Sequence, residues 1–250
     1  MADWDRSFFR PGGGDAFISY LLFGQFGQMA ACSASRYDTA GLPAGVEVAM
    51  RLRTERPDAF QPWESGTFGM QLREAGLFEA VADAPAMLQL QGSVSDPGSL
   101  AYLRDSIGVA KCLLDQGGVA ILDPQALKWW TPPAWTAQIF DAHEPQPRQH
   151  AVILVSEDEG DPSLNWYHTR GMRKFARPDL SIHAVPRDLE PAVIDLLNRF
   201  IEMEAFGAIV EDGQPIRMAS LPDGLTCHPQ GDFDDPAFNN VHLEIAWPAR

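Results

Sequence analysis

The chain has 250 residues, of which 45% are apolar and 21% are charged, and its formal net charge at pH 7 is -15. This composition is typical of a globular protein with enough chain to bury a core, so general disorder is excluded. An acidic surface repels the phosphates of nucleic acids and anionic lipids, so we expect neither a nucleic acid nor a membrane as a partner. The charge suits solubility, or docking to a basic protein.

The cysteines and the N-terminal region indicate a cellular compartment. Cys32, Cys112 and Cys227 lie far apart with no CxxC spacing, and such an odd, sparse set predicts free thiols in a reducing environment. Residues 1–14 contain acidic residues and lack an apolar stretch, so they do not have the pattern of a signal peptide. The apolar run at 16–31 is too short for a membrane span and is interrupted by glycines and glutamines. We therefore expect a cytoplasmic protein of bacterial type.

The first third of the chain shows few clear patterns. Residues 16–31 open with an apolar run that predicts a buried strand, and the alternation that begins at Val46 predicts a second strand. Residues 67–81 are predicted to form a helix broken near Gly76. We assign residues 1–84 to an N-terminal segment packed on a main domain.

The main domain, residues 85–250, contains two stretches with one order of elements: an apolar strand, an amphipathic helix, a glycine stop, then a strand and a turn. In the first stretch, residues 87–130, Asp96 and Pro97 are suited to begin the helix, and apolar residues recur at steps of three and four from Leu100 to Leu114.

The second stretch, residues 180–219, follows the same order, with a helical apolar stripe from Val193 to Ile201, Gly207 as the stop and a strand at 208–210. We therefore predict an α+β fold, a mostly antiparallel sheet packed by helices, built from two similar βαββ halves that share one sheet. Chance similarity of two ordinary βαβ-like units is the alternative. A short helix at 134–140, a strand from His150 and an alternating final strand complete the prediction.

A basic segment, WYHTRGMRKFARPDL at 166–180, is the best candidate site in this acidic chain. Arg170 and Arg173 could hold a carboxylate or phosphate through forked hydrogen bonds, with Lys174 beside them. His168 could act as a general acid or base near neutral pH.

Asp123, at the strand end of the first half, is a further candidate ligand-binding residue. The alternative is that the basic segment is a turn that neutralises the acidic runs at 157–161 and 231–235, since ion-pair clusters commonly have no catalytic role.

This segment resembles one found in a family of uncharacterised bacterial domains of unknown function, in which TRG(M/L)xKFxxP(D/E)L precedes an amphipathic helix. The matching residues are Thr169, Arg170, Gly171, Met172, Lys174, Phe175, Pro178, Asp179 and Leu180. The resemblance covers residues 87–220 and implies an α+β domain without implying an activity.

Other chemical signatures are lacking in the sequence. It contains no Walker loop, dinucleotide fingerprint, GxSxG elbow or HExxH pair, so we expect no cofactor and no metal. Trp129, Trp130 and Trp135 are typical of core packing or, if they are exposed, of a protein contact.

Two classes of function remain. The first is a non-catalytic interaction module whose acidic face, or the region Trp129–Trp135, docks onto a basic protein, for example to neutralise a basic toxin enzyme. The second is an enzyme or small-anion binder centred on His168, Arg170 and Arg173. We favour the first hypothesis, because the acidic balance is directly observed in the composition.

Overall fold

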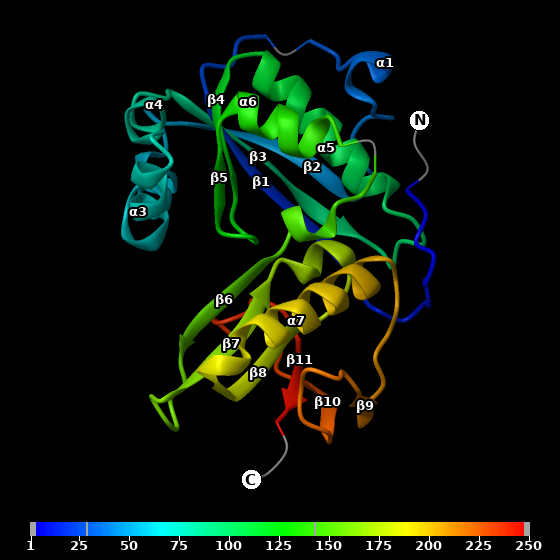
Figure 1. Ribbon diagram of the computed structural model, residues 1–250. Helices are drawn as coiled ribbons and strands as arrows, with labels where there is room; N and C mark the ends of the chain where they lie inside the picture. The colour runs from blue at the N-terminus through cyan, green and yellow to red at the C-terminus, as the bar shows by residue number, and fades with distance from the viewer. Residues whose placement is uncertain (1–3, 29, 143, 248–250) are drawn as a thin grey trace. The chain divides into compact units, whose positions relative to one another are not determined.

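A computed structural model of the protein describes residues 4–28, 30–142 and 144–247 (Figure 1). The fold is α+β, with antiparallel and mixed sheets packed by helices, as predicted. The chain forms two compact units. The first contains Asp15–Gln146 with the chain start up to Asp5, and the second contains Arg6–Gly14 with the chain from Pro147 onward.

This division differs from the sequence-based one, which placed the boundary between residues 84 and 85. Residues 15–84 and the stretch 87–130 build one unit together, while residues 180–219 belong to the other. The predicted boundary was misplaced because the first third carries two strands that pair with the first predicted half, and strand pairing is not visible in composition.

The first unit contains a five-stranded sheet in the order β2-β3-β1-β4-β5, in which all neighbours are antiparallel. Its strands are β1 (Ala16–Gly24), β2 (Val46–Leu52), β3 (Ala86–Val94), β4 (Gly118–Asp123) and β5 (Lys128–Trp130). Its α-helices are α1 (Ala34–Tyr37), α2 (Gln61–Glu64), α3 (Gly66–Glu74), α4 (Phe78–Ala82), α5 (Ala101–Asp115) and α6 (Pro132–Trp135), the last continued by a π-helix at Thr136–Phe140.

Helices cover both faces of this sheet, which explains why the central strand β1 is almost continuously apolar. On one face Tyr20 packs edge-on against Trp135 of α6, with ring centroids 5.2 Å apart. On the other face Phe23 lies in a cluster with Phe60 and Leu72 from the α2–α4 region. Figure 1 shows α5 and α6 in front of the sheet and α3 and α4 at its side.

Cys32 and Cys112 form a disulfide in the first unit, contrary to the prediction of free thiols. Cys112 lies in α5 and is fully buried, and Cys227 is the free, buried cysteine among the described residues. The prediction failed because the two partners are 80 positions apart in sequence, and no local spacing reveals the pairing.

The second unit contains a six-stranded mixed sheet in the order β6-β7-β8-β11-β10-β9, in which β8 and β11 are parallel. Its strands are β6 (Val152–Glu157), β7 (Leu164–Arg170), β8 (Asp179–Pro186), β9 (Gln214–Ile216), β10 (Leu225–Gln230) and β11 (His242–Ala246). Its helices are α7 (Glu190–Ala205) and the 3-10 turns Pro147–Gln149, Met172–Phe175 and Arg187–Leu189.

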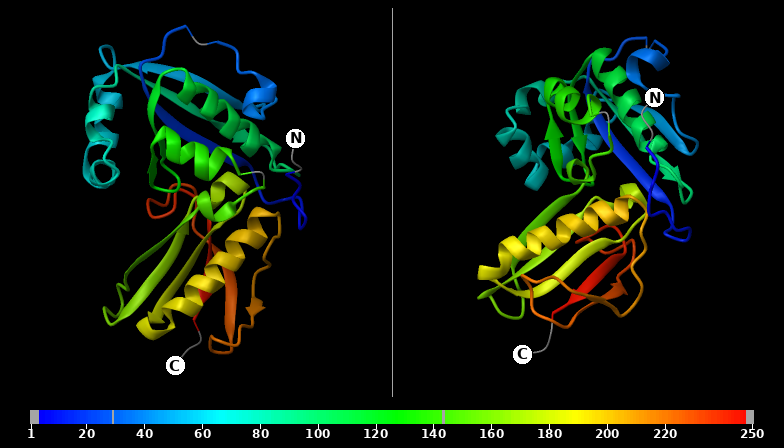
Figure 2. Two further views of the ribbon diagram at one scale, coloured as in Figure 1. Left: turned by 45° about the horizontal axis from the view of Figure 1, so that its top comes forward. Right: turned by 45° about the vertical axis from the view of Figure 1, so that its right-hand side comes forward.

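The long helix α7 covers one face of this sheet (Figure 2). The predicted stripe is buried, with Val193 and Leu197 fully enclosed. Tyr167 of β7 points to the same side, because its hydroxyl donates to Glu190 at the start of α7 at 2.9 Å. Alternation along β7 then directs Trp166 and His168 to the opposite face.

The order of elements predicted for the two similar halves is found in the first half and only partly in the second. Residues 86–130 form a βαββ unit, but α5 begins at Ala101, where the Ser99 hydroxyl accepts the N–H of Ala101, so Asp96 is not its cap. In the second half the strand predicted at 208–210 is absent, and the next strand is β9. The prediction of one shared sheet was wrong, because each half belongs to the sheet of its own unit.

Candidate functional site

The basic segment forms the end of β7, a 3-10 turn and the start of β8, all in the second unit. Gly171, which opens the turn, has a φ of 112°, a conformation that glycine adopts without strain. A Cβ at this position would lie 2.4 Å from the carbonyl oxygen of His150. The chain therefore turns sharply at Gly171, between the end of β7 and the 3-10 turn that carries Arg173 and Lys174.

Two cations of this segment are internal, contrary to both sequence interpretations. Lys174 is fully buried, and its Nζ donates to the carbonyl oxygen of His150 at 2.9 Å. Arg177 is buried as well, and its guanidinium donates to the carbonyl oxygens of Gly207 at 2.6 Å and Ala208 at 2.9 Å. Lys174 is thus a structural residue and not a ligand-binding one, because its ammonium group is enclosed and held by a backbone carbonyl.

Arg6, on the N-terminal segment of the same unit, has the same role. Its side chain is buried and donates to the carbonyl oxygens of Phe175 at 2.7 Å, Ala205 at 3.0 Å and Glu204 at 3.2 Å. The guanidinium group thereby joins the end of α7 to the basic turn. Nothing in the local sequence around Arg6 signalled this role, because its partners lie far along the chain.

His168 lies in a stack of rings on the face of the sheet opposite α7. Its imidazole stacks on Trp166 with centroids 4.0 Å apart and meets the edge of Phe238 at 5.4 Å. Trp166 in turn stacks on His183 at 4.9 Å, and Phe238 stacks on His242 at 4.2 Å. We call these five residues the ring cluster; sequence analysis singled out one of them.

Burial, reinforced by the charge of Arg170, lowers the pKa of His168 from 6.5 to about 4. The imidazole is therefore neutral at pH 7, and it is poorly suited to donate a proton in that range. Its Nδ1 is buried, and no described residue forms a hydrogen bond with it. Of the two roles that the sequence suggested, general acid or general base near neutral pH, the role of general acid is not supported by this environment.

The two remaining arginines of the segment are partly accessible. Arg173 donates to the carbonyl oxygen of Asn239 at 3.2 Å, and its guanidinium lies 4.7 Å from the centre of the exposed Phe233 ring. Arg170 is half-buried, and no described residue accepts a hydrogen bond from its buried Nε. Burial lowers the pKa of both guanidinium groups, and Asp179 opposes this effect at Arg170.

Two buried carboxyl groups, one within the basic segment and one on α7, were not predicted to contribute to the site. Asp179 accepts hydrogen bonds from the Thr169 hydroxyl at 3.0 Å and from the Asn240 amide at 2.9 Å, and burial still raises its pKa to about 6. Glu204 is fully buried on α7, and neither of its carboxylate oxygens meets a described hydrogen-bond partner. Burial raises the pKa of Glu204 well above its ordinary value.

The other predicted site residues belong to the first unit and are structural. Asp123 is buried, and one of its oxygens accepts the backbone N–H groups of Gln125 and Ala126 at 3.1 Å, which closes the β4–β5 turn. Trp129, Trp130 and Trp135 are 7%, 3% and 1% exposed, so they form core and not a protein contact.

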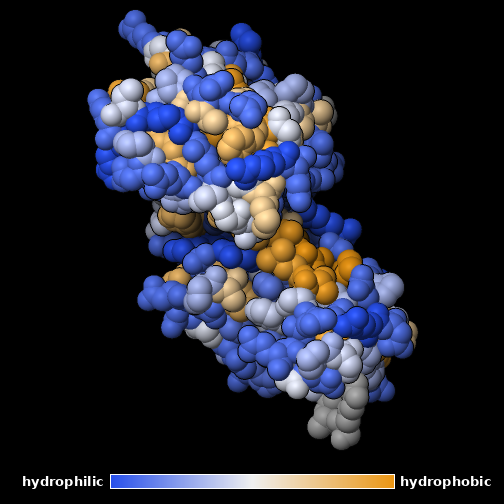
Figure 3. Space-filling view, turned by 90° about the vertical axis from the view of Figure 1, so that its left-hand side faces the viewer, coloured by the Kyte–Doolittle hydropathy of each residue, from blue (hydrophilic) through white to orange (hydrophobic). Residues whose placement is uncertain are grey.

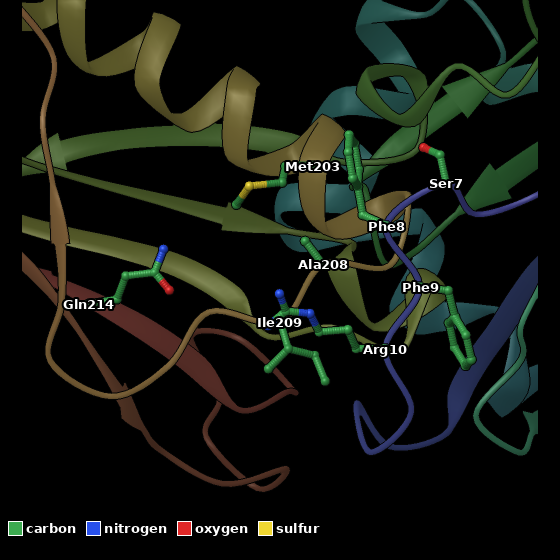
Figure 4. A pocket seen from close by; sticks show the side chains of 8 residues that line it. All are labelled: Ser7, Phe8, Phe9, Arg10, Met203, Ala208, Ile209 and Gln214. Atoms are coloured by element: carbon green, nitrogen blue, oxygen red, sulfur yellow. The ribbon is translucent and has the colours of Figure 1, made fainter.

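An open groove of about 470 Å³ lies in the second unit, between the N-terminal segment and the loop that follows α7 (Figure 4). Phe8, which is exposed, and Met203 line it together with Ile209. Arg10 is the one titratable side chain among the described residues of its lining. The groove therefore offers no acid–base pair, and we assign no chemistry to it.

In the described part of the chain, no group of three or more His, Cys, Asp or Glu side chains is arranged to hold a metal ion. No described helix is long and apolar enough to cross a membrane. The chain matches no protein-family model, no curated protein and no solved structure.

Proposed function

We propose that the protein is a non-catalytic interaction module whose acidic exterior binds a basic protein. The observation that carries this proposal is the location of the cations in the second unit. Arg6, Lys174 and Arg177 are all less than 5% exposed and donate to backbone carbonyls, so their charges are withdrawn from the surface.

The acids of the second unit remain largely outside. Exposed carboxylates occur at the β6–β7 turn (Glu157, Glu159 and Asp161), after α7 (Glu211 and Asp212), and at Asp223, Asp232 and Asp234. Several exposed arginines are already paired, as Arg148 is with Glu202 at 2.9 Å and Arg199 is with Asp195 at 2.9 Å. Such a surface attracts a cationic partner over a distance and accelerates its association.

Neutralisation of a basic toxin enzyme is the specific form of this proposal, since an acidic inhibitor would cover the substrate-binding cations of such an enzyme. The proposed location needs revision in one respect. The sequence favoured the cytoplasm, whereas a disulfide such as Cys32–Cys112 persists more readily in an oxidising compartment. Thiol labelling of the protein in intact cells distinguishes the two locations.

A second candidate function, the binding of a small anion, is favoured by Arg170. Its buried Nε has no described acceptor, and an oxyanion would satisfy it. Titration with inorganic phosphate, followed by calorimetry, tests this candidate. Saturable binding by the wild type that is lost in Arg170→Gln would favour the anion binder, and no heat of binding would exclude phosphate as the ligand.

The interaction module is tested by affinity capture from the organism that encodes the protein. We expect the tagged wild type to recover one basic protein in stoichiometric amount, and to release it as salt is raised, because salt screens the attraction. The variant Glu157→Lys with Glu159→Lys should bind it about tenfold more weakly. The matched control, Glu74→Lys with Glu79→Lys, reverses two exposed acids of the first unit. Recovery of no basic protein, or capture that salt and the first variant leave unchanged, would refute the proposal.

A further inference from the structure

In the described part of the chain, the two sheets have four edge strands, and three of these are protected against pairing with another chain. β5 and β9 are only three residues long, and β9 contains Pro215, which cannot donate a backbone hydrogen bond. β2 is longer but carries the exposed charged residues Glu47 and Arg51. Short length, proline and charge are the usual means by which sheet edges are kept from associating.

The fourth edge strand, β6, has none of these features in its first half. It is six residues long and begins with the uncharged run Val152–Val155. An uninterrupted apolar run is typical of strands buried on both faces, yet β6 pairs only with β7, and no described strand pairs with its other side. Val155 is 47% exposed. Figure 3, which views the side along which β6 runs, shows strongly hydrophobic residues gathered on the surface of the second unit.

We propose that β6 receives an extended segment of the partner protein as an additional strand of the sheet. This inference rests on the proposed interaction function and assigns it a surface. Strand addition supplies backbone hydrogen bonds along the open edge, and the flanking apolar side chains give the added strand a surface on which to pack. The half-buried Ile153 and Leu154, which point to opposite faces of the sheet, would each gain cover.

The charges at the end of β6 define the chemistry of the segment. Glu157 at the end of the strand and Glu159 and Asp161 in the following turn are exposed, while residues 151–155 are uncharged. A complementary segment therefore has β-branched or aliphatic residues along its length and lysine or arginine where it passes the turn. Val155 alternates with Leu154, so the apolar residues of the segment would meet apolar neighbours on both faces.

Charge also decides between a foreign segment and a second copy of this chain. Each copy carries a net charge of -15, so self-association at β6 brings two strongly negative molecules together. A basic partner gains from the same field that opposes self-association. The open edge therefore fits a foreign, cationic strand better than its own copy.

The test uses Val155→Lys, which places a charge on the exposed edge, and Val119→Lys as its matched control. Val119 is also a strand valine and is 38% exposed, but it lies in β4, an interior strand of the first unit's sheet, far in sequence from the β6 edge. The probe is a synthetic peptide of alternating valine and threonine with a lysine-rich end. Its backbone N-methylated analogue cannot donate the hydrogen bonds of a strand.

We expect the peptide to bind the wild type and the control, to slow hydrogen exchange of β6 amides, and to bind Val155→Lys about tenfold more weakly. The N-methylated analogue should not bind. Equal binding by Val155→Lys, or protection confined to other strands, would overturn the inference. So would a sedimenting dimer that Val155→Lys dissociates, because the occupant would then be a second copy. If Val155→Lys still captures the basic protein with full affinity while the acid-reversed variant does not, the β6 assignment fails and the interaction function stands.

Discussion

The disulfide between Cys32 and Cys112 gives the most direct quantitative prediction. It closes a loop of 80 residues, and in the chain-entropy treatment a cross-link of that span removes about 15 cal/mol/K from the unfolded chain. At room temperature this corresponds to about 4.5 kcal/mol of stability in the first unit. The substitution Cys32→Ala removes the cross-link at its partly exposed end and leaves the buried Cys112 in place within α5.

Hydrogen exchange measures this loss for each unit separately. We expect the slowest amides of β1 and β3 to lose up to about 4.5 kcal/mol of protection in Cys32→Ala, and the wild type to lose as much when a reductant is added. Amides of β7 and β8 in the second unit should be unaffected. Cys227→Ala is the control, because that thiol is free and buried, so its variant should still respond to the reductant.

Three results would refute the reasoning on the disulfide. The first is a count of three free thiols in the denatured, unreduced protein. The second is a loss below about 1 kcal/mol in β1 and β3, because loop closure by the disulfide would then contribute little. The third is an equal loss in β7 and β8, which would mean that the cross-link does not act on the first unit alone.

Further substitutions test the second unit and the two helical stripes. His168→Phe keeps a ring in the ring cluster but removes a group whose pKa is lowered to about 4, so the wild type should lose stability as pH falls from 6.5 toward 4 and the variant should lose less. Hydrogen exchange of β7 amides measures the difference between the wild type and the variant. The raised pKa of Asp179 has the opposite effect, because it makes stability fall as pH rises, so the direction of the pH dependence distinguishes the two groups. Parallel pH profiles of the wild type and the variant would contradict the assignment to His168. Glu204→Met should raise the free energy of unfolding by roughly 1–3 kcal/mol at pH 7, because it removes a buried carboxyl without hydrogen-bond partners. Since burial raises the pKa of Glu204, the wild type loses stability as pH rises above 4.5, so urea unfolding should show a larger gain at high pH than at low pH, and a gain independent of pH would count against the assignment. Leu103→Ala and Leu197→Ala should each cost roughly 2–5 kcal/mol in urea unfolding, and losses below about 1 kcal/mol in both would be incompatible with buried stripes.

Local patterns were sufficient to predict several elements of this fold. The apolar run that opens residues 16–31 predicted β1, because a strand covered on both faces contains few polar residues. The helical stripes predicted α5 and α7, because each of these helices buries one face. The break near Gly76 was also predicted correctly, and the chain there has a φ of 68° between α3 and α4. In each case the signal and the structure lie within one short window of sequence.

The site was harder to predict, because its features depend on residues far apart in the sequence. A cluster of basic residues suggested a surface site, yet Lys174 and Arg177 bond to carbonyls that no local pattern identifies. The strand predicted from His150 occurs as β6, and only the strand order places it at the edge of the sheet. His183 and His242 join the ring cluster from two other strands, so neither could be associated with His168 in advance.

The discontinuity of the second unit has a consequence for synthesis on the ribosome. Arg6–Gly14 emerges early, but the carbonyls that receive the Arg6 side chain belong to residues 175, 204 and 205, which are translated much later. Most of the first unit is outside the exit tunnel before those acceptors are translated. The first unit can therefore fold while Arg6 has not yet formed its hydrogen bonds. The earliest translated part of the second unit is therefore among the last parts of the protein to fold.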